Sequence, residues 1–158
     1  MTTNNEPATI IYVDADACPV KAEILKVAER HGLPVVIVSN SGMRPSRDPL
    51  VRHVVVSASF DAADNWIAEH AAAGDIAVTA DVPLADRCVK AGARVVAPTG
   101  RAFTESSIGS DLAMRNLMTG LRETGQIRGG GRPFTKADRS RFLQALDQAV
   151  QALRRRST

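Results

Sequence analysis

Aromatic residues are scarce in this 158-residue chain, at 4%, so its core has to be built from aliphatic side chains. Only two cysteines occur, Cys18 and Cys88, and they have neither the spacing of a zinc site nor the number that a disulfide framework needs. No apolar run approaches the roughly 20 residues of a membrane span, and the polar residues 1–7 lack the apolar stretch of a signal peptide. These absences predict a cytoplasmic globular protein whose cysteines are reduced thiols and which has no membrane partner.

The net charge of +3 hides an uneven distribution. Residues 1–97 carry 9 Lys/Arg and 12 Asp/Glu, a net charge of −3, whereas residues 98–158 carry 11 and 5, a net charge of +6. An acidic front half joined to a basic back half suggests an anionic ligand held beside an acidic site. A solvated basic C-terminus is the alternative that the charges alone leave open.

Short β-branched runs alternate with helical patterns in the first two thirds of the chain. Strands are predicted at residues 9–14, 35–39, 53–57, 76–79 and 94–97, and helices at residues 19–31, 61–73 and 82–91. Strands separated by helices of about ten residues predict right-handed βαβ units. The expected fold class is therefore α/β, with a parallel sheet that is covered by helices on both faces.

The pattern changes after Pro98 and becomes helical. Ser110 is predicted to cap a helix that ends at Gly125. Thr135 and Asp138 have the spacing of a capping box in front of a second helix. The predicted apolar stripes are Leu112, Leu117, Met118 and Leu121 in the first helix, and Phe142, Leu143, Leu146, Val150 and Leu153 in the second. We expect a single domain over residues 1–158, with a core at about 8–98 and a helical extension at about 108–156.

Aspartates follow three of the predicted strands. Asp14 and Asp16 come where the first strand ends, and Asp81 follows the fourth. Asp61 and Asp64 open the helix after the third strand and share one face of it. Ligands bind at the carboxyl ends of strands in an open parallel sheet, so these acids are expected to gather at one edge.

Several carboxylates at one edge need a cation or protonation to offset their repulsion. Hard carboxylate oxygens suit Mg²⁺ or Mn²⁺, so we expect a divalent metal site. Each acid also has a structural alternative. Asp16 or Asp61 can be a helix N-cap, Asp64 can favour a first turn through the helix dipole, and Asp81 can begin a turn.

Two enzyme mechanisms and one binding function use the same acids. In the first mechanism, Asp14, Asp16, Asp64 and Asp81 hold one or two metal ions that activate water for attack on a phosphodiester of RNA or DNA. The basic back half then neutralises the flanking phosphates. A module that binds nucleic acid without turnover is the non-catalytic alternative.

The second mechanism is that of a haloacid-dehalogenase-like phosphatase. The string IIYVDADACPV (10–20) resembles that family's hhhhDxDxT opening, and VVIVSN (35–40) resembles its second motif. The resemblance implies Asp14 as nucleophile, Asp16 as acid/base, Ser39 as phosphate ligand, and Asp81 and Asp86 as magnesium ligands. The chemistry also uses a lysine ahead of the last acidic motif, and no lysine occurs between Lys26 and Lys90. The phosphodiester mechanism therefore ranks first.

Arginines in two polar segments are the candidate phosphate ligands. Arg44 and Arg47 lie in the segment after the second strand, and Arg128 and Arg132 flank a triple glycine. Their guanidinium groups and the glycine amides can contact phosphates. A solvated basic loop is the alternative.

Longer segments carry a more specific resemblance. They are VDADACPVK (13–21), DAADNWI (61–67), GDIAVTADVPLADRC (74–88), GARVVAPTGR (92–101), LAMRNLM (112–118) and GRPFTKADRSRF (131–142). On these segments the chain resembles the bacterial YaiI/YqxD family, whose members look like PIN and NYN-type nuclease domains.

This resemblance implies a Rossmann-like, PIN-type sheet with strand order 3-2-1-4-5. It also implies that Asp14, Asp16, Asp64 and Asp81 occupy the acidic positions of a PIN-like metal site, with Asp61 as a further candidate. One feature departs from the PIN pattern. PIN nucleases often carry a glutamate in the helix after the second strand, whereas Glu69 lies in the helix after the third.

Overall fold

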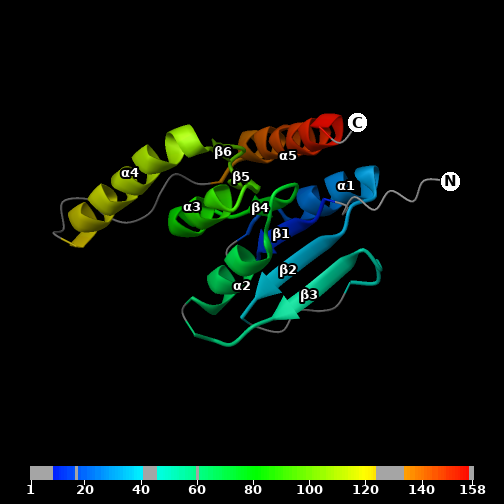
Figure 1. Ribbon diagram of the computed structural model, residues 1–158, viewed down its shortest axis with the longest axis horizontal. Coiled ribbons are helices and arrows are strands. Elements are labelled where there is room, and N and C mark those ends of the chain that lie inside the picture. The colour runs from blue at the N-terminus through cyan, green and yellow to red at the C-terminus, as the bar shows by residue number, and fades with distance from the viewer. Residues whose placement is uncertain (1–8, 17, 41–45, 60, 124–133, 157–158) are drawn as a thin grey trace.

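The structure is a computed structural model that describes residues 9–16, 18–40, 46–59, 61–123 and 134–156. The described residues form six strands: β1 (Ile11–Asp14), β2 (Val35–Ser39), β3 (Val51–Val55), β4 (Ile76–Val78), β5 (Arg94–Val96) and β6 (Ala102–Phe103). The same residues form five helices: α1 (Lys21–His31), α2 (Ala62–His70), α3 (Val82–Lys90), α4 (Glu105–Glu123) and α5 (Lys136–Arg156). Figure 1 shows how these elements are arranged.

The strands form one sheet in the order β3-β2-β1-β4-β5-β6. Strands β1 to β5 are parallel, which confirms the α/β class and the predicted order 3-2-1-4-5. β6 is an addition that pairs antiparallel with β5, and its two residues are too short to give a sequence pattern. β3 begins and ends two residues earlier than predicted. The strand order reverses between β1 and β4, so the carboxyl ends of these two strands flank a topological switch point.

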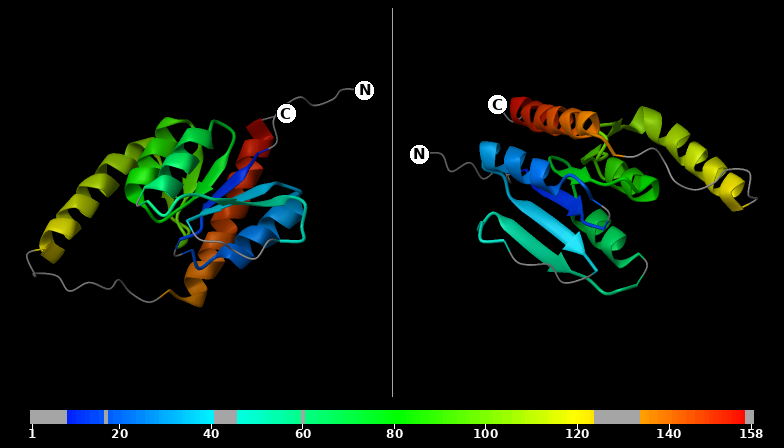
Figure 2. Two further views of the ribbon diagram at one scale, coloured as in Figure 1. Left: turned by 90° about the horizontal axis from the view of Figure 1, so that it is seen from below. Right: turned by 180° about the vertical axis from the view of Figure 1, so that it is seen from behind.

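Side-chain alternation along the strands divides the core between the two faces of the sheet. Ile11 and Val13 pack with α1 and α5 on one face. Tyr12, between them, packs with α2 and α3 on the other. Figure 2 shows these helix pairs on opposite sides of the sheet. Because both faces are covered, the strands read as continuous aliphatic runs.

Helix α5 closes the first of these faces. Its predicted capping box is confirmed: the Thr135 N–H donates to Asp138 Oδ2 (2.9 Å), and the Asp138 N–H donates to Thr135 Oγ1 (3.1 Å). Its apolar stripe is buried as predicted, with Phe142 and Leu146 at 0% exposure and Val150 at 1%. The C-terminal helix is therefore part of the core of the domain and covers β5 and α1.

Helix α4 differs from the prediction at its start and in its apolar stripe. It begins at Glu105, because Thr104 and Ser107 cap it reciprocally through N–H to hydroxyl bonds of 3.1 and 3.0 Å. Ser110, the predicted cap, lies inside the helix, and the predicted end at Gly125 lies outside the described residues.

The stripe of α4 is largely uncovered. Leu117 is 55% exposed and its neighbour Met114 is 58% exposed, whereas Leu112 and Met118 are half-buried. The side chain of Leu121, the fourth residue of the predicted stripe, is not among those that the structure describes. The helix packs on α3 near its start and then projects away from the sheet (Figures 1 and 2). In the described part of the chain, no helix is both long and apolar enough to cross a membrane.

Candidate metal centre at the carboxyl edge of the sheet

Asp14 and Asp81 are joined through one buried hydroxyl group. Asp14 is the last residue of β1, and Thr79 directly follows the neighbouring strand β4. Thr79 Oγ1 donates to Asp14 Oδ2 (2.9 Å) and accepts from the Asp81 N–H (3.0 Å). Thr79 is only 2% exposed, so this bridge is fixed within the core. The Asp14 carboxylate and the backbone of Asp81, more than 60 residues later in the sequence, therefore lie together at the switch point.

A helix cap orients the carboxylate of Asp81. Asp81 is the N-cap of α3, and its Oδ1 accepts from the Leu84 N–H (2.9 Å). Pro83 stands in the first turn, where its missing N–H costs no hydrogen bond. The structural role of Asp81 and a ligand role are compatible, because the cap occupies Oδ1 and each carboxylate oxygen has more than one acceptor site.

Asp64 lies close enough to Asp14 and Asp81 to be repelled by both carboxylates. Burial of this first-turn residue of α2, followed by repulsion from Asp81 and Asp14, raises the pKa of Asp64 from 3.8 to about 6. The pKa of Asp14 is raised for related reasons: burial is the largest cause, the Thr79 hydrogen bond opposes it, and Asp16 and Asp81 add repulsion. Neighbouring carboxylates therefore disfavour ionisation of both Asp14 and Asp64.

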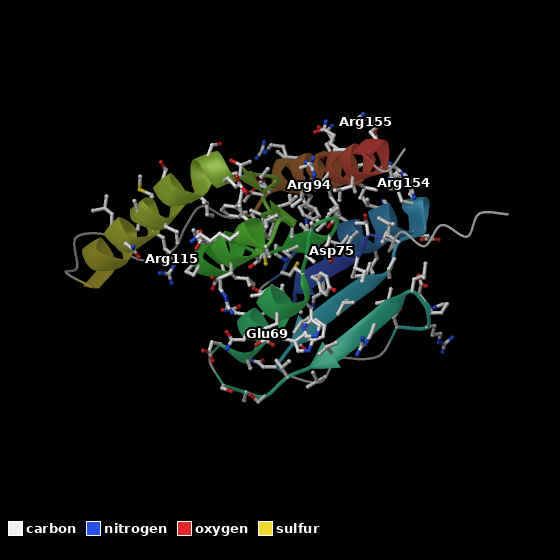
Figure 3. All side chains as sticks on the ribbon, viewed as in Figure 1. Glu69, Asp75, Arg94, Arg115, Arg154 and Arg155 are labelled. Carbon is white, nitrogen blue, oxygen red and sulfur yellow. The ribbon has the colours of Figure 1, made fainter. Side chains whose placement is uncertain are left out.

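The other two predicted acids lie at the periphery. Asp16 is exposed and reaches Asp14 through its charge and through its backbone N–H. Asp61 is also exposed; it occupies the N-cap position of α2 but makes no capping hydrogen bond with its side chain. Glu69, on the same helix, is exposed to solvent (Figure 3). Both exposed acids still act on the others through their charge, Asp16 on Asp14 and Asp61 on Asp64.

The donor atoms at this edge fit Mg²⁺ or Mn²⁺ in kind, although they do not form a closed cage. Among the described residues, no group of three or more His, Cys, Asp or Glu side chains is arranged to hold a metal ion. Mg²⁺ commonly binds through one or two carboxylates, with waters and substrate phosphates completing its shell. The linked pair of Asp14 and Asp81 has the composition of such an open site.

Two residues of this edge carried no signal in the sequence analysis. Thr79 looked like the end of a strand, and its function as a bridge depends on the β1–β4 register. Arg87 lies in the last turn of α3, and no motif in the sequence marks it. It donates to Asn65 Oδ1 (2.7 Å) and thereby ties α3 to α2, and its charge partly opposes the rise in the pKa of Asp64.

The structure describes only one of the four arginines that were predicted to bind phosphate. Arg47 is described and exposed, whereas Arg44, Arg128 and Arg132 lie outside the described residues. Near the triple glycine, Arg139 forms an ion pair with Glu23 (3.2 Å) within the protein. Arg141 likewise pairs with the buried Asp138. These two contacts favour the alternative that part of the basic back half covers the protein's own acidic groups.

The residues of the phosphatase alternative are not arranged as that mechanism requires. Asp86, a magnesium ligand in that scheme, forms an ion pair with Lys90 (2.9 Å) one turn along α3. Ser39, at the end of β2, is 3% exposed. Burial raises the pKa of the nearby Cys18 thiol, so this cysteine is not an activated nucleophile.

The fold and this edge define an α/β protein of the open parallel-sheet class, with an acidic polar site at the switch point. The chain belongs to the family described as "Uncharacterized BCR, YaiI/YqxD family", whose profile matches residues 12–152.

Close relatives carry the name UPF0178 protein. The chain is 64% identical to one from Rhizobium meliloti (92% of this chain, 100% of the relative). It is 66% identical to one from Rhizobium etli (88% and 90%) and 63% identical to one from Parvibaculum lavamentivorans (94% and 97%). No solved structure matches the chain. Neither the family description nor these names state an activity.

Proposed function

We propose that the carboxyl edge of the sheet binds Mg²⁺ or Mn²⁺ and hydrolyses phosphodiesters of RNA or DNA. The observation that carries this proposal is the Thr79 hydroxyl, which binds the Asp14 carboxylate and the Asp81 backbone N–H and so holds two acidic residues from different elements together. Repulsion from Asp81 is one cause of the raised pKa of Asp14, and repulsion between acidic groups costs stability. A cation offsets that cost.

The environment of each residue suggests its role in this reaction. Asp14 and Asp81 would hold the cation, which supplies Lewis-acid polarisation of the phosphodiester and activation of water. Asp64, whose pKa of about 6 lies near neutrality, is suited to accept a proton from the attacking water. The charge of Arg87 partly offsets, at Asp64, the repulsion from the other two carboxylates.

Cleavage of labelled single-stranded RNA and DNA by the purified protein tests the proposal. We expect cleavage that requires Mn²⁺ or Mg²⁺ and that stops in EDTA. Asp81→Asn should abolish it without unfolding α3, because an Asn side-chain oxygen still caps a helix. Asp14→Asn should act similarly, since Asn can still accept from Thr79.

Asp86→Asn is the matched control, because Asp86 lies on α3 but pairs with Lys90. Its cleavage rate should equal that of the wild type. Cleavage unchanged by Asp81→Asn would contradict the proposal. So would release of phosphate from monoesters that depends on Asp14, since that is the phosphatase reaction. Binding of both polymers without turnover in either metal would leave only the non-catalytic module.

Metal binding can be measured separately from activity. A ligand that binds only the folded state raises the midpoint of thermal unfolding by mass action. We expect Mn²⁺ to raise the midpoint of the wild type, and the double change Asp14→Asn with Asp81→Asn to remove that rise. An equal rise in the double variant would place the cation elsewhere.

A further inference from the structure

A cleft of about 610 Å³ opens directly beside the acidic edge. Ala80 and Val82, which flank Asp81 in the sequence, both line it. The cleft lies between the start of α3, the loop that leads into β6, and the side of α4. Its size is in the range of small-molecule sites in proteins.

The walls of the cleft are mainly apolar and partly fixed in place. They include Pro19, Pro98, Phe103, Met114, Met118 and Phe134. Arg139 donates to the Pro19 carbonyl oxygen (2.7 Å) and lies 5.1 Å from the centre of the Phe134 ring, so one arginine positions two of these walls. A planar, partly apolar group can therefore stack in the cleft.

One buried oxygen atom in the wall lacks a donor. Asp111 lines the cleft and is 7% exposed, and its Oδ1 accepts from Arg101. Its Oδ2 is buried and makes no hydrogen bond among the described residues. An unsatisfied buried carboxylate oxygen is costly, so a ligand whose N–H donor reaches this atom when the covering side chains move aside gains a strong interaction.

The rim of the cleft is positively charged. The Arg101 side chain is 59% exposed, and Arg115 extends from α4 (Figure 3). Both line the cleft. Two guanidinium groups disfavour a cationic ligand and favour one that carries phosphate. Apolar walls, a buried acceptor and a cationic rim together match a nucleotide.

We propose that this cleft binds one nucleobase of the nucleic-acid strand and that Asp111 selects bases with an amino group. The inference deepens the proposed function and rests on it, because the cleft adjoins the edge where the phosphodiester would lie. Cytosine presents its N4 amino group to an acidic acceptor. Uracil presents an oxygen at the same position, and this oxygen would face the carboxylate.

Binding of oligo(C) and oligo(U) of equal length, measured by fluorescence anisotropy in EDTA, tests the inference. We expect wild-type protein to bind oligo(C) at least about fivefold more tightly. Asp111→Asn should reverse the preference. Arg101 keeps the side-chain oxygen as its acceptor, so the amide NH₂ replaces Oδ2 and donates to the uracil oxygen.

Two neighbouring residues of α4 supply a second variant and its control. Met114→Ala removes an exposed side chain from the wall of the cleft and should lower the affinities for oligo(C) and oligo(U) by a similar factor. Leu117→Ala, equally exposed but outside the residues that line the cleft, should change neither affinity. If Asp111→Asn does not fold, unchanged affinities in Met114→Ala overturn the inference.

The results separate this inference from the proposed function, because the binding assay needs neither a cation nor turnover. Equal wild-type affinities for the two oligomers, or an unchanged preference in a folded Asp111→Asn protein, overturn the base pocket even where metal-dependent cleavage is found. A preference for oligo(C) that Asp111→Asn reverses supports the pocket even where cleavage fails, and then only the proposed function falls.

Discussion

Asp64 destabilises the metal-free protein at neutral pH, so its replacement by asparagine should stabilise the fold. The carboxyl is partly buried and is repelled by Asp81 and Asp14, and its pKa is raised from 3.8 to about 6. Asparagine has nearly the same shape and carries no charge. The change Asp64→Asn therefore removes the repulsion and keeps the packing of α2.

The size and sign of the effect follow from proton binding. Below pH 3.8 the carboxyl is protonated in the folded and unfolded chain alike, so its ionisation costs no stability. As pH rises through 6, the folded protein also loses the proton, and the stability that the protonated form contributed is lost. The shift in pKa sets an upper limit of about 3 kcal/mol. Solvent screening of this partly exposed group reduces the expected effect to on the order of 1 kcal/mol.

Urea denaturation in EDTA at pH 7.5 and pH 4.5 measures this effect. We expect Asp64→Asn to be about 1 kcal/mol more stable than the wild type at pH 7.5, a rise in thermal midpoint of roughly 2–4 °C. The difference should shrink at pH 4.5. Asp61→Asn, an exposed residue at the start of the same helix, is the control and should change stability by less than about 0.5 kcal/mol.

Two outcomes would refute this reasoning. A destabilised Asp64→Asn protein at pH 7.5 would mean that the carboxylate makes a favourable contact. A gain of equal size at both pH values would mean that the cause is not ionisation. Under the proposed function, the stabilised variant should also respond less to Mn²⁺ than the wild type, because the repulsion that it removes is the one that a cation offsets.

Three further changes test other parts of the structure by denaturation. Thr79→Val should cost about 1–3 kcal/mol of stability, because it removes the bridging hydroxyl from its buried partners, and it should reduce the Mn²⁺ response. Thr79→Ser should retain the stability and the Mn²⁺ response of the wild type. Gly100→Ala should cost at least about 3 kcal/mol, because φ is +91° and the added Cβ would lie 2.7 Å from the α5 backbone; Gly32→Ala, with φ +66° and open space, should cost about 1 kcal/mol. The hydrogen bond to His31 lowers the pKa of Asp147, so Asp147→Asn should lose up to about 1 kcal/mol at pH 5.5, and the difference should vanish as pH falls well below 3.8. A constant difference across that pH range would contradict the assignment.

The sequence by itself determined the local elements, because their signals lie within a few residues. Aliphatic runs gave all five parallel strands, and a capping box marked the start of α5. The same locality explains the error at α4. Its cap, Thr104 with Ser107, follows the same reciprocal pattern, whereas the predicted cap, Ser110, is followed three residues later by Ala113, which cannot complete a capping box.

Tertiary structure decided which acids meet. Asp14, Asp16 and Asp81 looked equivalent in the sequence, yet only the β1–β4 register brings Thr79 between Asp14 and Asp81. Asp16 lies beyond the strand end and is exposed. The distinction is set by pairing between residues 65 positions apart, and no local pattern encodes it.

The same holds for the basic half of the chain and for the cleft. Arg139 carries the same charge in any environment, and only the packing of α5 on α1 directs it to Glu23 and the Pro19 carbonyl. Asp111 lies in α4, where most of the described side chains are exposed. Its own side chain is buried and accepts a hydrogen bond from Arg101, and its other oxygen has no donor among the described residues. Charge and helical period are properties of the chain, whereas desolvation and unmet hydrogen bonds arise only when distant segments exclude water together.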